Sequence, residues 1–324
     1  MSLLNNLNES QREAGKTIDG PLLILAGAGS GKTRTITYRI AHMVKEKGIS
    51  PYQILAVTFT NKAAKEMRER VHSLIGQEAE KIVVSTFHSF GMKFLRMYAN
   101  ALGYDSNFNI YDTDDQSRVV KNIQKELGIK SEESPKRLIS LISKLKEDSV
   151  SPEEYEKTVP SFLENYKNII EIYKRYDGEL KKNNAMDFSD LLINTNRLLD
   201  NKEILEKVQE RYKYIMVDEY QDTNNIQYQI VKKIASKYQN ICVVGDEDQS
   251  IYGFRGANIQ NILDFEKDYP RAKVVKLEQN YRSTSTILAA ADEVIKYNKQ
   301  RTEKKLWTEN EKGVPITVYE ALNE

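Results

Sequence analysis

Two short segments of this 324-residue chain are dense in side chains that could do chemistry. The first, Ala26–Thr33, reads AGAGSGKT, a glycine-rich loop that ends in a lysine and a hydroxyl residue. The second, Val217–Asp222, reads VDEYQD and supplies three carboxylates. A glycine loop aims backbone N–H groups at phosphate oxygens, and carboxylates beside it can hold a metal ion. The pair predicts a site for a nucleoside triphosphate and Mg²⁺.

The glycine loop stands in the right context for phosphate binding. It follows an apolar run, Pro21–Leu25, and precedes Arg34–Lys47, whose apolar residues recur at helical spacing. Lys32 is placed to reach the β- and γ-phosphates, and the Thr33 hydroxyl to bind Mg²⁺. We expect the following residues to contact the nucleotide: Ala26, Gly27, Ala28, Gly29, Ser30, Gly31, Lys32 and Thr33. Ala26 departs from the usual pattern, which has glycine there; the alternative is a glycine-rich turn without a ligand.

The acidic segment follows a second strand-like run, Tyr214–Met216. Acidic residues at the carboxyl end of a parallel strand face the ligand crevice of the sheet. Asp218 is therefore predicted to bind Mg²⁺ together with Thr33, and Glu219 to orient or deprotonate the attacking water. An Asp-Glu pair alone is more often a solvated turn, so this prediction depends on the loop upstream.

A third cluster lies in Gly245–Ala257, where an apolar run ends in a polar, glycine-rich loop. Its Gln249 could hydrogen-bond a γ-phosphate and report whether that phosphate is present. Its Tyr252, Phe254 and Arg255 offer aromatic rings and a cation, which suit base stacking on a single strand. Ordinary core packing is the alternative for the rings.

Two further clusters follow strand-like runs. In Glu278–Ser283, Arg282 could complement charge on a transferred phosphoryl group and Tyr281 could stack on a purine; the alternative is a surface pair at a helix start. In Thr58–Lys62, hydroxyls, an amide and a cation suit a sugar-phosphate backbone. Asn61 is also predicted to cap a helix over residues 62–75.

The elements that must position these clusters alternate in type along the chain. Strands are expected at Ile54–Phe59, Ile82–Thr86, Tyr214–Val217, Ile241–Val244 and Val274–Leu277, with helices between them. Residues 112–182 read as helices only, with one helix start at Ser151–Glu154. Gly313–Tyr319 reads as one further strand. The pattern predicts an α/β fold with a parallel sheet and an all-helical insertion.

Composition excludes several classes of protein. With 40% hydrophobic and 29% charged residues, the chain is predicted to be globular, and no apolar run suggests a signal peptide or membrane span, so we expect a cytoplasmic protein with no membrane partner. The single Cys242 lies in an apolar run and the three histidines are far apart, which argues against disulfides and metal clusters. Because the net charge is only +1, DNA binding would need local patches, such as Lys296–Lys305 or Lys136–Lys146. Either tract could instead be a solvated helix face.

In their order, these segments resemble the superfamily-one DNA helicases of the UvrD, Rep and PcrA type. The similarity runs from LNESQ at residues 7–11 through AGAGSGKT, TFTNKAAKEM, STFHSF, MDFSDLL, VDEYQD, GDEDQSIYGFRGA and QNYRST to KKLWTEN at residues 304–310. The resemblance implies an ATP- and Mg²⁺-dependent enzyme that moves 3′ to 5′ along single-stranded DNA and acts at junctions with duplex. It also implies that Gln11 and Arg34 hold the adenosine, Tyr281 stacks on adenine, and Arg282 and Gln249 touch the γ-phosphate.

The resemblance also implies a DNA track and a domain division. The track residues are Phe59, Thr60, Asn61, Lys62, Thr86, His88, Phe188, Tyr252, Phe254 and Arg255, with Phe254 standing where the family usually has tryptophan. Residues 1–108 and 186–283 would form a RecA-like P-loop lobe with helices on both faces, and residues 109–185 the helical insertion. Residues 284–324 would be a connecting helix and the start of a truncated second RecA-like lobe. The rest of that lobe is expected to be missing from this chain.

Three functions remain open at this point. The chain could be the N-terminal portion of a DNA-dependent ATPase and helicase with DNA repair or replication partners. It could instead be an ATP- and DNA-binding module that hydrolyses poorly because the second lobe is absent. A generic phosphate-loop kinase or repair ATPase is less favoured, since a kinase needs neither Gln249 nor the Tyr281-Arg282 pair.

Overall fold

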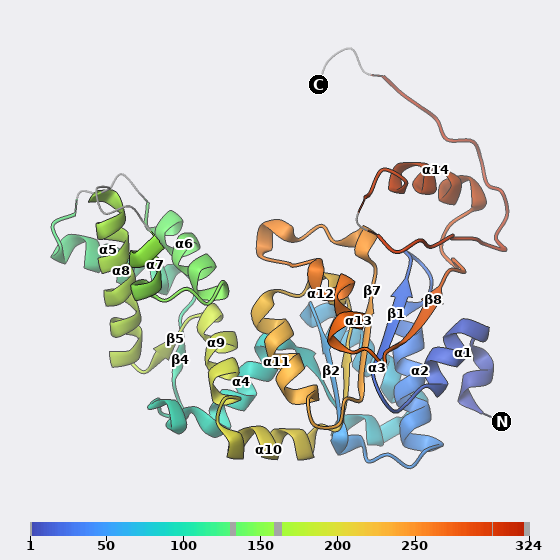
Figure 1. Cartoon of the computed structure of the whole chain (residues 1–324), viewed down its shortest axis with the longest axis horizontal. Helices are drawn as coiled ribbons and strands as arrows, with labels where there is room; N and C mark the ends of the chain where they lie inside the picture. Colours follow the sequence, from blue (N-terminus) through green and yellow to red (C-terminus); the bar gives the residue numbers. More distant parts are fainter. Residues whose placement is uncertain (1, 130–133, 159–163, 300, 321–324) are drawn as a thin grey trace. The chain divides into compact units, whose positions relative to one another are not determined.

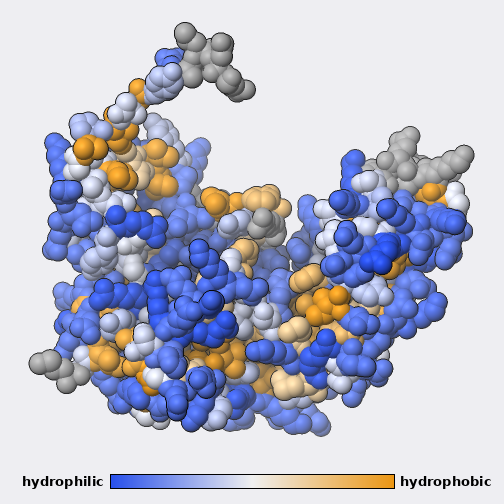
Figure 2. Space-filling view, turned by 180° about the vertical axis from the view of Figure 1, so that it is seen from behind, coloured by the Kyte–Doolittle hydropathy of each residue, from blue (hydrophilic) through white to orange (hydrophobic). Residues whose placement is uncertain are grey.

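The computed structural model describes residues 2–320 except 130–133, 159–163 and 300 (Figure 1). The chain divides into two compact units, each built from separate stretches of sequence. Unit 1 comprises Met1–Ser85, Glu210–Thr223 and Ala235–Glu324, and unit 2 comprises Thr86–Gln209 and Asn224–Ile234. On the face drawn in Figure 2 the surface is mostly hydrophilic, with apolar residues in small groups between charged ones.

Unit 1 is built on a six-stranded sheet. Its strands are β1 Leu22–Ala26, β2 Ile54–Thr58, β3 Val83–Thr86, β6 Tyr214–Val217, β7 Ile241–Gly245 and β8 Lys273–Leu277. They lie in the order β3-β2-β6-β7-β1-β8, and the pairs β2–β6, β6–β7, β7–β1 and β1–β8 are all parallel. β1, β2 and β7 are buried along their whole length, which explains their continuous apolar sequences. The predicted parallel α/β sheet is confirmed.

Unit 1 also contains helices, of which α2 and α3 pack against the sheet. The helices of this unit are α1 Glu9–Lys16, α2 Lys32–Lys45, α3 Asn61–Ile75, α12 Gln260–Leu263, α13 Phe265–Asp268 and α14 Ser285–Ile295. Ile36 and Ile40 of α2 and Met67 of α3 pack in one apolar cluster with Leu22 and Ile24 of β1. Because α2 follows β1 directly, this packing fixes the loop that joins them.

Unit 2 is mainly helical. Its elements are α4 Phe87–Tyr98, β4 Asn109–Ile110, α5 Thr113–Glu126, α6 Pro135–Glu147, α7 Pro152–Thr158, α8 Glu164–Lys182, β5 Ala185–Met186, α9 Phe188–Leu198, α10 Lys202–Arg211 and α11 Asn225–Ala235. The core of α5, α6 and α8 includes Val120, Ile142 and Tyr176. At the predicted helix start, Ser151 accepts from the Glu154 N–H and Glu154 from the Ser151 N–H, a capping box.

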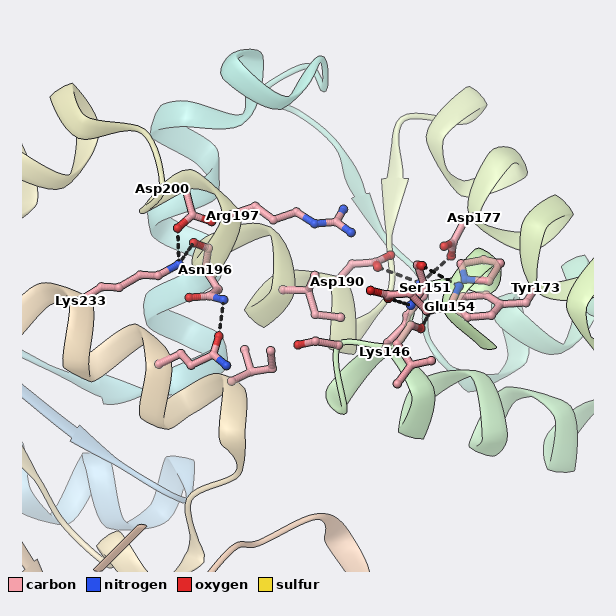
Figure 3. A pocket seen from close by; sticks show the side chains of 16 residues that line it. Lys146, Ser151, Glu154, Tyr173, Asp177, Asp190, Asn196, Arg197, Asp200 and Lys233 are labelled. Carbon is pink, nitrogen blue, oxygen red and sulfur yellow. Dashed lines mark hydrogen bonds and ion pairs between the residues drawn. The ribbon is translucent and has the colours of Figure 1, made fainter. Parts of the chain in front are cut away.

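A buried lysine joins three segments of unit 2. Lys146 of α6 is 4% exposed and lies 2.9 Å from Asp177 of α8, 3.0 Å from Asp187 and 2.8 Å from Asp190 of α9. Dashed lines in Figure 3 join it to Asp177 and Asp190, at one end of a cavity of about 520 Å³. The DNA patch considered for residues 136–146 therefore ends in a lysine that carboxylates already neutralise.

Two local predictions are wrong. Residues 313–319 form no strand: Val314 and Val318 are 84% and 90% exposed, and no described strand pairs with them. A segment with an alternating apolar sequence forms a β-strand only when a neighbouring strand offers backbone hydrogen bonds. The cap of α3 is Thr60 rather than Asn61, because the Thr60 side chain accepts from the Ala63 N–H at 3.1 Å and Asn61 is already helical.

Two features of composition are visible in the structure. No helix among the described residues is long and apolar enough to cross a membrane. Cys242 of β7 is 1% exposed within the apolar cluster of unit 1, as predicted for a small buried hydrophobe, and burial raises the pKa of its thiol.

Candidate nucleotide site and nucleic-acid surface

The glycine loop is shaped by close approaches that only glycine permits. Gly29 and Gly31 have φ of 70° and 83°, in the left-handed region. A Cβ added to Gly29 would lie 2.7 Å from Asn280 Nδ2, and one added to Gly31 would lie 2.7 Å from Gln11 Nε2. Ala26 is the last residue of β1 and fully buried, so its methyl group belongs to the core and does not disturb the loop.

The N-terminus of α2 is left open for an anion. Gly31 caps this 14-residue helix without a side-chain hydrogen bond, so the first-turn N–H groups gain no side-chain acceptor from the cap. Such groups carry partial positive charge and bind phosphate. The Ser30 hydroxyl donates to the Gly27 carbonyl at 2.7 Å, which stabilises the turn ahead of the helix. Lys32 and Thr33 are the first two residues of α2.

The lysine of the loop and the predicted base meet. Lys32 Nζ lies 2.8 Å from Glu219 Oε2, although 187 positions separate them in sequence. Glu219 is the second residue after β6 and has φ 52° and ψ 48°, a left-handed conformation that is uncommon for a residue with a side chain. A strained backbone conformation persists only when contacts with the surrounding residues stabilise it, and such conformations are common at functional sites.

Three carboxylates crowd this lysine. Burial first, and then the charge of Glu219, raise the pKa of Asp218 to about 7, while Lys32 lowers it. The same two causes raise the pKa of Asp222 to about 6. Asp218 and Asp222 are 5% and 6% exposed. The site thus holds more buried negative charge than one lysine neutralises.

This charge imbalance fits a magnesium site. Asp222 Oδ1 is buried and has no hydrogen-bond partner among the described residues. Mg²⁺ that binds beside phosphates takes one or two carboxylates and completes its shell with other oxygens.

A segment after β8 docks on the glycine loop. The Asn280 amide donates to the Ala28 carbonyl at 2.5 Å, and its oxygen accepts from the N–H groups of Arg282 and Ser283 at 2.8 and 2.7 Å. The Tyr281 N–H donates to the carbonyl of Gly29 at 3.0 Å. Arg282, whose side chain is exposed, is thereby fixed beside the loop.

The predicted adenosine contacts, Gln11, Arg34 and Tyr281, also lie around this loop. Asn8 Nδ2 donates to the Tyr281 hydroxyl at 2.8 Å, and the Asn8 N–H donates to Gln11 at 3.3 Å. Gln11 is 2% exposed and donates to the Ser30 carbonyl at 2.9 Å. Arg34 is exposed and donates to a backbone carbonyl of the N-terminal segment at 2.7 Å. Here Gln11 supports the loop and Tyr281 presents a ring that is 47% exposed.

Glu219 and Gln249 line one cavity of unit 1, which has a volume of about 410 Å³. Gln249 donates to the Asp246 carboxylate, which holds its amide at the cavity wall. Phe59, Thr60 and Tyr252 line the same cavity. The predicted base, the predicted γ-phosphate contact and part of the predicted DNA track therefore share one space.

The aromatic residues of unit 1 form a cluster that reaches the surface. The rings of Phe59 and Tyr252 stack with centroids 5.3 Å apart, and the Tyr252 and Phe254 centroids are 6.0 Å apart. Phe254 is 79% exposed, which excludes the core alternative for this ring. Asn61 and Lys62 are exposed at the start of α3. The Arg255 side chain lies outside the described part of the structure.

Three predicted DNA contacts belong to unit 2. The Thr86 hydroxyl caps α4 by accepting from the Ser89 N–H at 3.2 Å. The His88 and Phe188 rings meet edge to face with centroids 6.1 Å apart. Phe188 opens α9 and is 53% exposed, while burial lowers the pKa of His88. His88 is thus favoured in its neutral form.

Several residues of the site were not predicted. They are Gln221, Asp222, Asn280 and Lys304. Three of them have partners that are remote in sequence, since Gln221 contacts Asp246, Asn280 contacts Ala28 and Lys304 contacts Asp246. Lys304 is 5% exposed and lies 2.6 Å from Asp246 Oδ1, so the tract 296–305, considered for DNA, also contains a lysine that is already neutralised. Only the fold brings these partners together.

Comparisons with known proteins show the family of this chain. A family model described as the UvrD/REP helicase N-terminal domain matches residues 7–270, and one described as the UvrD-like helicase C-terminal domain matches residues 275–324. ATP-dependent DNA helicases named PcrA from Staphylococcus aureus and Staphylococcus epidermidis are 52% identical to the whole of this chain. The chain spans 44% of the length of these relatives. It belongs to the UvrD/REP helicase family.

Proposed function

We propose that this chain is the ATP-binding portion of an ATP-dependent DNA helicase. The observation that carries the proposal is the meeting of Lys32 with Glu219 beside a cavity that Gln249 and Tyr252 also line. The names of the relatives, ATP-dependent DNA helicase PcrA, support the same activity. A motor of this kind couples ATP hydrolysis to movement along single-stranded DNA. The 3′ to 5′ direction rests on family resemblance.

In the proposed reaction the chain's own groups bind the triphosphate and move one proton. The loop N–H groups and Lys32 bind the β- and γ-phosphates, and Arg282 and Gln249 contact the γ-phosphate. Thr33 and Asp218 would hold Mg²⁺, which supplies positive charge opposite the phosphate oxygens. Because Lys32 contacts Glu219 directly, a γ-phosphate competes with Glu219 for this lysine. Glu219 is then released to accept the proton of the attacking water.

Each unit has its own proposed DNA contacts. In unit 1, Phe59, Tyr252 and Phe254 offer aromatic faces on which bases could stack. In unit 2, the exposed ring of Phe188 is a separate proposed contact. We also propose the domain division 1–108 with 186–283, 109–185 and 284–324. The two family models meet between residues 270 and 275, which is before its last boundary.

ATP turnover tests this proposal. Mg·ATP hydrolysis by this chain should rise when a single-stranded oligonucleotide is added, and less when the same length is supplied as blunt duplex. Equal rates with and without the single strand would contradict the helicase proposal. Binding of both ligands without turnover would favour an ATP- and DNA-binding module instead.

A further inference from the structure

A buried amide links the proposed base to the loop after β7. Gln221 is 1% exposed, and its Nε2 donates to Glu219 Oε2 at 2.9 Å. Its Oε1 accepts from the Asp246 N–H at 3.0 Å. A Cβ added to Gly245 would lie 2.6 Å from this Oε1, so the glycine that ends β7 leaves room for the amide. Gln221 therefore fixes Glu219 and Asp246 relative to one another.

Asp246 continues the chain of contacts in two directions. One carboxylate oxygen accepts from the Gln249 amide, and the other lies 2.6 Å from Lys304 Nζ. Lys304 also lies 2.8 Å from Glu247 Oε2 and 3.5 Å from Asp248 Oδ2. Burial lowers the pKa of Lys304, but these carboxylates raise it above its usual value, so the lysine stays charged. A buried ammonium with these partners holds Asp246 in one position.

The segment that carries Lys304 also touches the phosphate loop. A Cβ added to Gly27 would lie 2.3 Å from Leu306 Cδ2, so the Leu306 side chain packs directly on this glycine. The Trp307 N–H donates to the Glu278 carbonyl at 3.0 Å, and the Asn280 N–H donates to the Trp307 carbonyl at 2.8 Å. Residues 304–307 thus contact both the loop that binds phosphate and the loop that carries Gln249.

We infer that Gln221 and Lys304 are positioning residues of the nucleotide site, and that they transmit the presence of the γ-phosphate to residues 304–307. The inference rests on the proposed function. When a phosphate oxygen accepts from the Gln249 amide, Asp246 Oδ2 loses this hydrogen bond, while Asp246 Oδ1 keeps Lys304 and the Asp248 N–H as its partners. Because Lys304 and Trp307 lie in the same segment, a shift of the Asp246–Lys304 ion pair also changes the surroundings of Trp307. That segment belongs to the region matched by the C-terminal helicase model.

Trp307 provides the measurement, because it is the only tryptophan of the chain and its side chain is 47% exposed. Its fluorescence is compared with Mg·ADP and with a non-hydrolysable Mg·ATP analogue bound, while calorimetry measures both affinities. The wild-type emission should differ between the two nucleotides. Lys304→Met should abolish the difference while both nucleotides still bind. Lys305→Met, at the exposed neighbour, is the matched control and should retain the difference.

Further variants separate a positioning role from a purely structural one. Gln221→Ala breaks the link from the other end and should also remove the emission difference. If Lys304→Met unfolds, Lys304→Arg is used instead. It keeps the positive charge and should show part of the wild-type emission difference between the two nucleotides. Nucleotides that bind without any wild-type emission difference, or a Lys304→Met emission like that of wild type, would overturn the inference. Failure of either nucleotide to bind the wild-type chain would instead overturn the proposed function.

Discussion

At the scale of single residues, Glu219 has the most constrained position in the proposed site. Its backbone is left-handed, its carboxylate contacts Lys32, and Gln221 donates to the same oxygen. A carboxylate held by a lysine and an amide is oriented before any ligand arrives. Lys32 and Gln221 thus set the orientation of the Glu219 carboxylate.

Glu219→Gln should remove turnover and keep binding. The amide cannot accept the proton of the attacking water, so kcat for ATP should fall by ~10²-fold or more. The affinity for Mg·ATP should change little, since the glycine loop and Lys32 remain. Single-turnover hydrolysis and calorimetry measure the two effects, with Glu203→Gln on the exposed face of α10 as control. Turnover that survives the substitution would assign the base elsewhere.

Asn280→Ala should weaken both the fold and nucleotide binding. Asn280 is 2% exposed and bonds the Ala28 carbonyl and the N–H groups of Arg282 and Ser283. Leaving such groups without partners should lower the free energy of unfolding by about 1–3 kcal/mol. Urea unfolding and Mg·ATP titration measure the losses, and Asn100→Ala at an exposed position is the control. Unchanged values for both would show that Asn280 does not hold the loop.

At the scale of elements, buried charge joins the helices of unit 2. Lys146 of α6 is paired with Asp177 of α8 and with Asp190 of α9, as Figure 3 shows. At the other end of the cavity, Lys233 of α11 lies 2.6 Å from Asp200. The pairs differ in exposure: the side chains of Lys146 and Asp190 are 4% and 14% exposed, whereas those of Lys233 and Asp200 are 26% and 67% exposed. Only the buried pair is expected to matter strongly for stability.

Lys146→Met tests the buried cluster. Removing the ammonium leaves uncompensated carboxylates in the interior and should lower the free energy of unfolding by about 3–5 kcal/mol. Lys144→Met, on the exposed face of the same helix, should change it little. Denaturant unfolding of the full chain compares the two. Equal stability of both variants would mean that the cluster does not stabilise α6.

The same cluster should make stability depend on pH. Burial first raises the pKa of Asp190 to about 6 from 3.8, with Asp187 adding to the rise and Lys146 opposing it. The folded chain then binds this proton more tightly than the unfolded chain, so this residue's contribution to stability is lost as pH rises from about 4 to 6. Asp190→Asn should make the fall of the unfolding free energy over this range shallower. An unaltered slope would contradict the shifted pKa.

The elements were more predictable than their contacts. β6 matches its predicted bounds and β7 differs by one residue, because buried parallel strands are continuous apolar runs. The strand expected at residues 313–319 was wrong because alternation does not reveal whether a neighbouring strand exists. The loop from Ala26 to Thr33 was recognisable because its glycines are local requirements. The ion pairs of Lys146 and Lys304 could not be recognised in the sequence, because their carboxylates lie on other elements. A lysine in a sequence is also more typical of an exposed helix face.

At the scale of the whole molecule, a net charge of +1 leaves little general attraction for DNA. Binding should then depend on the aromatic cluster. Phe254→Ala should weaken binding of a labelled single-stranded oligonucleotide, since stacking contributes about 1–3 kcal/mol per base. Fluorescence anisotropy measures this, with Tyr319→Ala, at an 88% exposed tyrosine, as control. An equal loss of oligonucleotide affinity in both variants would contradict a specific DNA contact at Phe254.

The proposed nucleotide site joins three distant stretches of the chain: the glycine loop, the segment after β6 and the segment after β8. Titration calorimetry of Mg·ATP with the wild-type chain and with Lys32→Ala measures whether this site binds the nucleotide. We expect one nucleotide per chain for the wild type, with binding weakened at least tenfold by Lys32→Ala and by omission of Mg²⁺. Binding that is equally tight in Lys32→Ala, or that ignores Mg²⁺, would contradict the proposed site.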